Sequence, residues 1–170
     1  MKKLAICLAD EQIGGIEVQI LLLAEREDWE VINRISRQVL ALHATWSPER
    51  YEVVENPYPV EYFLEDIQEK CLYTAKIENQ VVGYVRFRIW ETNGAGSVKQ
   101  KIMQIEEIGV EETQRHRGIG KMMMADLKEV AYAHGCAYMK LYVDVKNEDA
   151  FAYYKNSGFK VNNIGMQMKM

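Results

Sequence analysis

The chain has 170 residues, a length typical of a single domain that buries a sizeable core. Its net charge of −4 argues against a general nucleic-acid binder, because such proteins are usually basic. No stretch is long and apolar enough to predict a membrane span. We therefore expect one domain whose partners are neither nucleic acid nor membrane.

The cysteines Cys7, Cys71 and Cys136 have neither metal-ligand nor redox-pair spacing. Their odd number indicates reduced thiols in a cytoplasmic protein. The histidines are also dispersed, so the sequence predicts no metal. The apolar run near the start is too short for a signal peptide. Residues 1–17 are interpreted as an N-terminal extension of uncertain role, and the domain itself is expected to span 18–170.

A short apolar run over residues 18–24 predicts the first strand. A helix follows, because apolar residues recur there at spacings of three and four: Ile32, Ile35, Val39, Leu42 and Trp46. The segment 47–59 is either a solvated connection or a loop that faces a substrate. A second helix is expected over 60–70.

Residues 72–78 and 81–90 predict two strands joined by a tight turn. A loop with two glycines, residues 92–97, connects the second of them to another strand over 102–110. These segments predict an antiparallel run of strands in the middle of the chain.

A helical pattern covers residues 119–134, and an alternating strand pattern covers 138–145. Asn147 is a suitable N-cap residue for a helix expected over 148–157, and two short strands are expected at 159–162 and 166–170. The order of elements predicts a single α/β (α+β) domain with a mixed central sheet and helices on both faces.

The turn between the strand 102–110 and the next helix carries two glycines and a group of cations: Arg115, His116, Arg117, Gly118, Ile119, Gly120 and Lys121. Glycine lets backbone N–H groups approach a ligand, and a helix N-terminus presents free donors. Cations oppose the helix dipole at this end unless an anion is bound. The turn therefore predicts a phosphate-binding site.

Spacing excludes two common phosphate motifs. A P-loop needs a glycine where Arg115 stands and a serine or threonine where Met122 stands. A dinucleotide-binding fingerprint needs a third glycine at the position of Met123. The pattern that remains is Arg-x-x-Gly-x-Gly.

This pattern resembles the pyrophosphate-binding motif of the GNAT N-acetyltransferase superfamily, which uses acetyl-coenzyme A. The preceding strand has the family's usual form, and a second family signature is similar to Asn147, Ala150, Tyr153, Tyr154, Gly158 and Phe159. The resemblance implies a V-shaped splay between the strands 102–110 and 138–145, with the pantetheine arm of the cofactor between them.

The resemblance also implies which residues bind acetyl-CoA. They are the end of the strand and the glycine turn: Ile108, Gly109, Val110, Arg115, His116, Arg117, Gly118, Ile119, Gly120 and Lys121. Asn147 is implied to reach the cofactor, and Tyr154 to lie near its sulfur.

Acetyl transfer to a primary amine needs a base for the amine proton and an acid for the leaving thiolate. Tyr154 is the candidate acid. Glu106 and Glu107 are the candidate bases, and similar pairs in polyamine acetyltransferases favour Glu106. Strand alternation places Glu106 on the side of the strand that carries Ile108, but a bulge would change this, so the choice stays open. No histidine partner is evident near the cysteines, so direct attack in a ternary complex is expected.

The alternative is a non-catalytic acyl-CoA-binding or sensing module, although Tyr154 and the two glutamates favour an enzyme. The acceptor stays open among a polyamine, an amino acid, a peptide N-terminus, a protein lysine and an aminoglycoside. A monomer and a homodimer are both compatible with the sequence.

Overall fold

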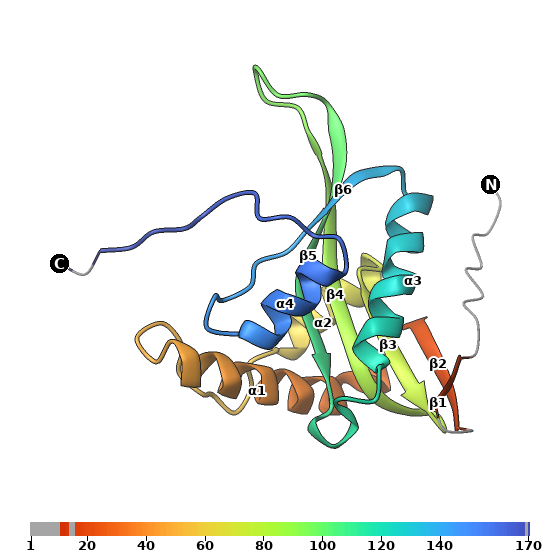
Figure 1. The fold of residues 1–170 in the computed structure, drawn as a ribbon. Coiled ribbons are helices and arrows are strands. Elements are labelled where there is room, and N and C mark those ends of the chain that lie inside the picture. Colours follow the sequence, from red (N-terminus) through yellow and green to blue (C-terminus); the bar gives the residue numbers. More distant parts are fainter. Residues whose placement is uncertain (1–10, 14–15, 169) are drawn as a thin grey trace.

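A computed structural model describes residues 11–13, 16–168 and 170, and it shows one sheet with helices on both faces (Figure 1). The strands lie in the order β1 (Glu11–Ile13), β2 (Ile16–Leu23), β3 (Leu72–Ile77), β4 (Gln80–Thr92), β5 (Gln100–Val110) and β6 (Cys136–Lys140). The helices are α1 (Trp29–Trp46), α2 (Val60–Gln68), α3 (Ile119–Ala133) and α4 (Glu148–Asn156), with single turns η1 (Arg26–Asp28) and η2 (Glu112–Gln114). Neighbouring strands are antiparallel except β5 and β6, which are parallel. The predicted mixed sheet is confirmed.

Two apolar clusters cover the two faces of the sheet. Val85 of β4 packs with the buried face of α3, whereas its neighbour Tyr84 packs with α1 and α2. Successive side chains of a strand point to opposite faces, which accounts for this division. The predicted stripe of α1 is buried at Ile32 and Ile35 but exposed at Leu42. No helix in the described part of the chain is long and apolar enough to cross a membrane.

The strands β5 and β6 separate part of the way along the sheet. Their pairing runs from Lys101 opposite Cys136 to Gln104 opposite Lys140, and β5 then continues to Val110 beside β4 alone. The predicted strand over 138–145 is therefore too long, because the chain leaves β5 after Lys140 and has no backbone partner there. This separation is the expected V-shaped splay.

The two strands predicted at 159–162 and 166–170 are wrong for the described residues, which form no strand after α4. Alternation of apolar residues is not sufficient, because a strand also needs a neighbouring strand for its backbone groups. The segment instead leads away from the body of the molecule (Figure 1).

The predicted N-terminal extension is only partly described. Its residues 11–13 form β1, which pairs with β2 from Glu11 opposite Val18 to Ile13 opposite Ile16. The part of the extension before residue 11 lies outside the described residues.

Candidate active site

The glycine turn connects β5 to α3 and leaves backbone donors free. Gly118 is the N-cap residue of α3 with a φ of 86°, a left-handed conformation that glycine adopts without strain. Its carbonyl accepts hydrogen bonds from the N–H groups of Lys121 and Met122, at 2.9 and 3.0 Å. The N–H groups of Ile119 and Gly120 precede these in the first turn, where a helix offers no backbone acceptor. They are therefore available to an anion at the positive end of the helix dipole.

The turn also has room for a ligand. A Cβ added at Gly118 would meet no atom within 4 Å, and one added at Gly120 would meet only Val110 Cγ2, at 3.8 Å. Lys121 is exposed and Arg117 half-buried beside this space. The turn therefore offers the space, the backbone donors and the nearby cations that a phosphate group requires.

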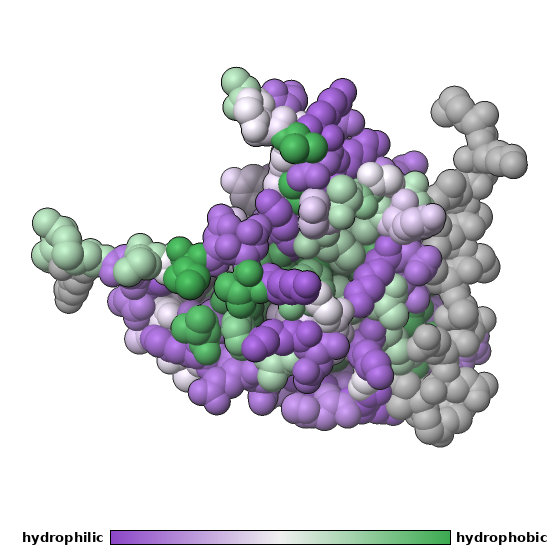
Figure 2. All heavy atoms as spheres, turned by 45° about the horizontal axis from the view of Figure 1, so that its top comes forward, coloured by the Kyte–Doolittle hydropathy of each residue, from purple (hydrophilic) through white to green (hydrophobic). Residues whose placement is uncertain are grey.

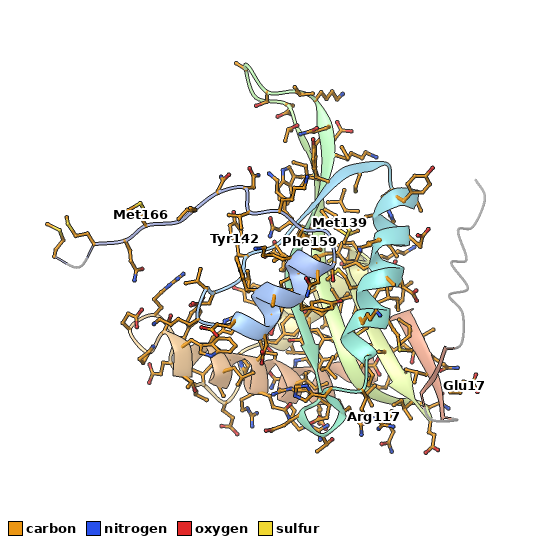
Figure 3. The ribbon with its side chains drawn as sticks, in the orientation of Figure 1. Glu17, Arg117, Met139, Tyr142, Phe159 and Met166 are labelled. Atoms are coloured by element: carbon orange, nitrogen blue, oxygen red, sulfur yellow. The ribbon has the colours of Figure 1, made fainter. Side chains whose placement is uncertain are left out.

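The two arginines of the turn have different surroundings. Arg115 Nε donates to the carbonyl of Val110 at 3.1 Å, and its Nη2 donates to Gln38 Oε1 at 3.4 Å. This guanidinium therefore fastens the turn to the end of β5 and to α1. Arg117 donates to Gln114 within the turn and lies beside the loop, below the start of α3, in Figure 3.

Gly109 on β5 is required by packing against α1. A Cβ at this position would approach Ile35 Cγ2 and Tyr84 Cε1 to 3.0 Å and Val39 Cγ2 to 3.2 Å. Gly109 therefore brings α1 close to the strand that borders the splay. In an antiparallel pair, every second residue directs its backbone N–H and C=O groups toward the partner strand, and the residues between direct theirs to the other side. On β5 these other groups point into the splay, because β4 is the only partner of β5 there among the described residues.

Tyr154 lies on α4, packed against the same apolar cluster as Ile108 of β5. Its ring contacts Phe159 edge-on, with centroids 5.7 Å apart. Burial, and to a lesser extent Tyr153, raises the pKa of Tyr154 to about 12, so its hydroxyl keeps its proton at neutral pH. Asn147 caps α4 by accepting a hydrogen bond from the N–H of Ala150 at 3.2 Å, as its position predicted.

Tyr153 has a role that the sequence did not reveal. Its hydroxyl donates to the carbonyl of Gly120 at 3.5 Å, which places the start of α3 beside α4. The paired tyrosines of the second signature were the available signal, but the partner 33 residues away was not predictable from the pattern. The contact brings the glycine cradle and the helix of Tyr154 together.

The two glutamates of β5 lie in different environments. Glu107 Oε1 accepts hydrogen bonds from Tyr84 Oη at 2.5 Å and from Ser36 Oγ at 2.9 Å, so this carboxylate faces α1. Burial, followed by the charge of Glu107, raises the pKa of Tyr84 well above its usual value. Glu106 is exposed and falls in a bulge, because Arg86 pairs with Glu107 while the next residue of β4 pairs with Ile105. The bulge shifts the alternation of β5 at this residue, so alternation alone does not fix where Glu106 points.

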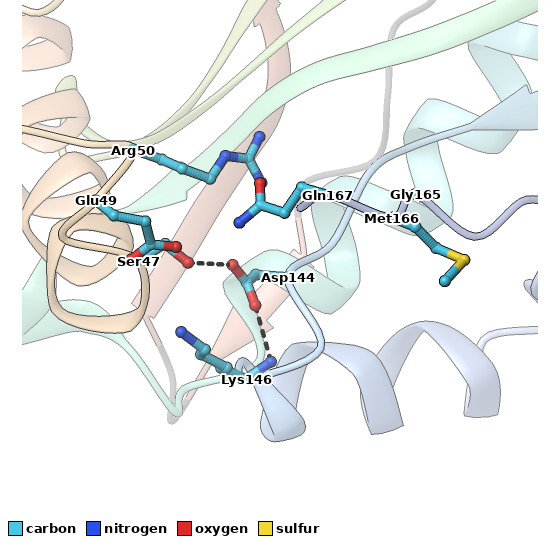
Figure 4. Close-up of a pocket in the computed structure, with 8 residues that line it drawn as sticks. All are labelled: Ser47, Glu49, Arg50, Asp144, Lys146, Gly165, Met166 and Gln167. Carbon is cyan, nitrogen blue, oxygen red and sulfur yellow. Dashed lines mark hydrogen bonds between the residues drawn. The ribbon is translucent and has the colours of Figure 1, made fainter. Parts of the chain in front are cut away.

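A hollow of about 440 Å³ lies between the end of α1, the segment after β6 and the C-terminal segment (Figure 4). Its charged side chains are two acids and two bases: Glu49, Asp144, Arg50 and Lys146. Ser47 Oγ donates to Asp144 Oδ2 at 2.9 Å, and the N–H of Lys146 donates to Oδ1 at 2.9 Å. The Lys146 N–H and then the Ser47 hydroxyl lower the pKa of Asp144, so it stays ionised.

The loop 47–59 therefore contributes its first residues to this hollow. Of the three glutamates in the loop, only Glu49 lines it. Asp144 and Lys146 were not recognised in the sequence, because they fell inside and just after a predicted strand. Among the described residues, no group of histidine, cysteine and carboxylate side chains is arranged to hold a metal ion.

Comparison with known proteins gives a consistent picture. Residues 39–159 match the Acetyltransferase (GNAT) family. An N-alpha-acetyltransferase of Sulfurisphaera tokodaii is 32% identical over 120 residues, which cover 65% of this chain and 70% of that protein. An N-alpha-acetyltransferase of Sulfolobus acidocaldarius is 30% identical over 144 residues, which cover 81% and 77%.

Solved structures agree in fold. A crystal structure of a mutant BH1408 protein from Bacillus halodurans superimposes with a TM-score of 0.82 at 20% identity, covering 88% of this chain and 98% of that one. An aminoglycoside N-acetyltransferase in complex with CoA has a TM-score of 0.55 at 17% identity, covering 82% and 91%.

Proposed function

The chain belongs to the acetyltransferase (GNAT) family and is a GNAT-type N-acetyltransferase, and from this premise we propose that it acetylates a primary amine by direct attack in a ternary complex. Acetyl-CoA, which this family uses, would supply the acetyl group as a thioester. One observation carries the proposal: the open cradle at Gly118 adjoins the helix of Tyr154 through the contact between Tyr153 and Gly120.

The cradle is proposed to hold the pyrophosphate. The free N–H groups of Ile119 and Gly120 would donate to its oxygens, and Arg117 and Lys121 would neutralise its charge. Arg115 would act indirectly, because its guanidinium already binds the end of β5 and α1.

The rest of the cofactor is proposed to lie along the splay. The backbone of Ile108, Gly109 and Val110 would pair with the pantetheine arm in place of the missing strand neighbour. The side-chain amide oxygen of Asn147 accepts the hydrogen bond that caps α4, and its NH₂ group would donate to the ligand.

Tyr154 is proposed as the acid. When the amine nitrogen bonds to the carbonyl carbon, the carbon–sulfur bond breaks and the thiolate needs a proton. Burial raises the pKa of Tyr154 to about 12, so its hydroxyl is protonated at neutral pH, and it donates to no acceptor among the described residues, so it is available to donate. The base would take the proton that the amine loses and release it to the solvent, and Tyr154 would regain a proton from the solvent before the next turnover.

Glu106 is proposed as the base and Glu107 as a positioning residue. Glu107 already accepts two hydroxyl donors on one oxygen and ties β5 to α1. Glu106 is exposed at the bulge, beyond the last pair of β5 and β6, where it can accept a proton directly or through water. A bulge commonly re-aims a side chain beside an active site.

The proposed acceptor is the α-amino group of a peptide. The relatives from Sulfurisphaera tokodaii and Sulfolobus acidocaldarius are both named as N-alpha-acetyltransferases. An α-amino group has a pKa of about 7.7–8.0, against about 10.4 for lysine, so far more of it is neutral near pH 7.5. The hollow between Ser47 and Asp144 carries both signs of charge, as a surface that receives a peptide end would.

The test is an acceptor panel at fixed acetyl-CoA, with CoA release and product mass measured together. The panel contains short peptides with free N-termini, the same peptides with blocked N-termini and one lysine, polyamines and an aminoglycoside. We expect turnover on free N-termini at a kcat/KM at least about tenfold above that of the other amines. Equal or faster turnover of lysine side chains or polyamines would contradict the α-amine proposal. Tight CoA binding without turnover of any amine would contradict the enzymatic one.

A further inference from the structure

The sheet extends beyond its helices at one end, where β4 and β5 form a hairpin that projects past them (Figure 1). Arg86 and Arg88 lie on the face of β4 that α2 covers, because Asp66 of this helix forms ion pairs with both arginines. Trp90 is the next residue of β4 on this face, since successive side chains of a strand alternate between its faces. It lies beyond the ion pairs and is 41% exposed.

Trp90 belongs to a row of three side chains that crosses the sheet. It pairs with Ile102 of β5, and Ile102 pairs with Tyr138 of β6. Paired residues of neighbouring strands carry their side chains on the same face. The next residues of the two strands, Met103 and Met139, belong to the core on the opposite face. Tyr138 is 58% exposed and Ile102 only 2%, so two exposed rings flank a buried aliphatic floor. We call these three residues the aromatic shelf.

The aromatic shelf is continuous with the candidate active site. The last pair of β5 and β6, Gln104 with Lys140, lies two residues along from Ile102 and Tyr138. Two residues of a strand span about 7 Å, so the shelf lies roughly that far from the opening of the splay. An extended peptide advances by the same amount in two residues. A peptide whose amine lies at the opening can therefore place its second or third side chain on the shelf.

The surroundings of the aromatic shelf are polar. The register places Arg88 and Lys140 between the shelf and the opening of the splay. Figure 2 shows mostly hydrophilic side chains on the part of the projecting hairpin that it displays. An exposed apolar patch with a polar rim is typical of a binding site. The two cations at this rim favour an apolar occupant over a basic one.

We propose that the aromatic shelf binds an apolar side chain at the second or third residue of the acceptor peptide and thereby selects among N-termini. This inference rests on the proposed acetylation of peptide α-amines. Aromatic rings bury a large apolar area, and the Ile102 floor closes the space between the two rings. The shelf contacts the peptide beyond the reacting amine, so it acts on KM rather than on kcat.

The test is a panel of peptides with free N-termini that differ only at the second and third residues, which are phenylalanine, leucine, glycine or lysine. Turnover is followed by CoA release and product mass. We expect phenylalanine or leucine at one of these positions to lower KM at least about fivefold relative to glycine, and lysine to give no such gain. The gain is expected to fall below about twofold in Trp90→Ala and in Tyr138→Ala, with kcat and Tm nearly unchanged.

Two control variants accompany the panel. Tyr132→Ala removes an 82% exposed ring from α3, and Trp90→Phe keeps an aromatic ring on the shelf, so both are expected to retain the preference. Acetylation of peptides without an apolar preference would overturn the shelf and leave the α-amine proposal standing. A preference that survives Trp90→Ala and Tyr138→Ala would do the same, because the peptide would then lie elsewhere, for example at the hollow of Asp144. No turnover of any peptide would contradict the proposed function itself, and the shelf proposal with it.

Discussion

The glycine cradle can be tested by a pair of substitutions at the two ends of α3. Gly118 and Gly135 flank this helix with φ values of 86° and 71°, and a Cβ at either would meet no atom within 4 Å. A side chain in this left-handed conformation costs about 1–2 kcal/mol. Gly118→Val and Gly135→Val are therefore expected to lower the free energy of unfolding by similar amounts, measured by urea denaturation.

Only Gly118→Val is expected to impair coenzyme A binding. Its side chain would fill the space in front of the N–H groups of Ile119 and Gly120. Hydrogen bonds to a charged group contribute about 1.5–3 kcal/mol each, so losing two corresponds to roughly 10²–10⁴-fold in Kd. Titration calorimetry with CoA at one pH and salt concentration measures this. Normal affinity in Gly118→Val, or an equal loss in Gly135→Val, would refute the cradle.

The remaining predictions concern the chemistry and the stability of the fold. Tyr154→Phe is expected to lower kcat by about 10²-fold or more with CoA affinity retained, because the leaving thiolate loses its acid. Tyr153→Phe is the control, since it loses only a long hydrogen bond of 3.5 Å, and its kcat is expected to change by less than about threefold. Glu106→Gln is expected to lower kcat at neutral pH with CoA affinity retained, measured by CoA release and titration calorimetry. The neighbouring Glu107→Gln is expected to lower the Tm instead, and the reverse outcome would exchange their roles. The pKa of Tyr154 is raised from 10.0 to about 12 by burial, so its contribution to stability is full below pH 10.0 and is lost as the pH rises towards 12. Denaturation at pH 9 to 12 is expected to show a smaller loss in Tyr154→Phe than in the unmodified chain. The carboxylate of Asp66 on α2 is fully buried and forms ion pairs with Arg86 and Arg88 of β4. Asp66→Ala is therefore expected to lower the free energy of unfolding by about 3–5 kcal/mol in urea denaturation. A loss below about 1 kcal/mol would contradict a stabilising role of these ion pairs.

The sequence predicted those features that depend on neighbouring residues. The glycine spacing located the turn before α3, and Asn147 predicted the start of α4, because caps and turns are local. The stripe of α1 and the strand expected over 81–90 likewise predicted elements on which the two clusters of the core are built.

The features that were missed depend on distant partners. The strand expected over 138–145 ends at Lys140 because β5 no longer faces it, which no property of the strand itself reveals. The bulge at Glu106 arises from its register with Arg86 of β4. The hollow joins Ser47 to Asp144, and 97 residues separate them in the sequence.

The separation of β5 and β6 lies where the candidate site and the departures from the sequence predictions meet. A parallel pair stabilises both strands along its length, yet here pairing stops at Gln104 opposite Lys140 while β5 continues to Val110. Backbone N–H and C=O groups on both arms are then left to water or to a ligand, since unpaired groups are unfavourable when buried. Sequence rules fail at the same place: the alternation of β5 is interrupted by Glu106, and the predicted end of β6 is lost. Rules that use only neighbouring residues are expected to fail where strands stop pairing with each other and leave their backbone groups to a ligand.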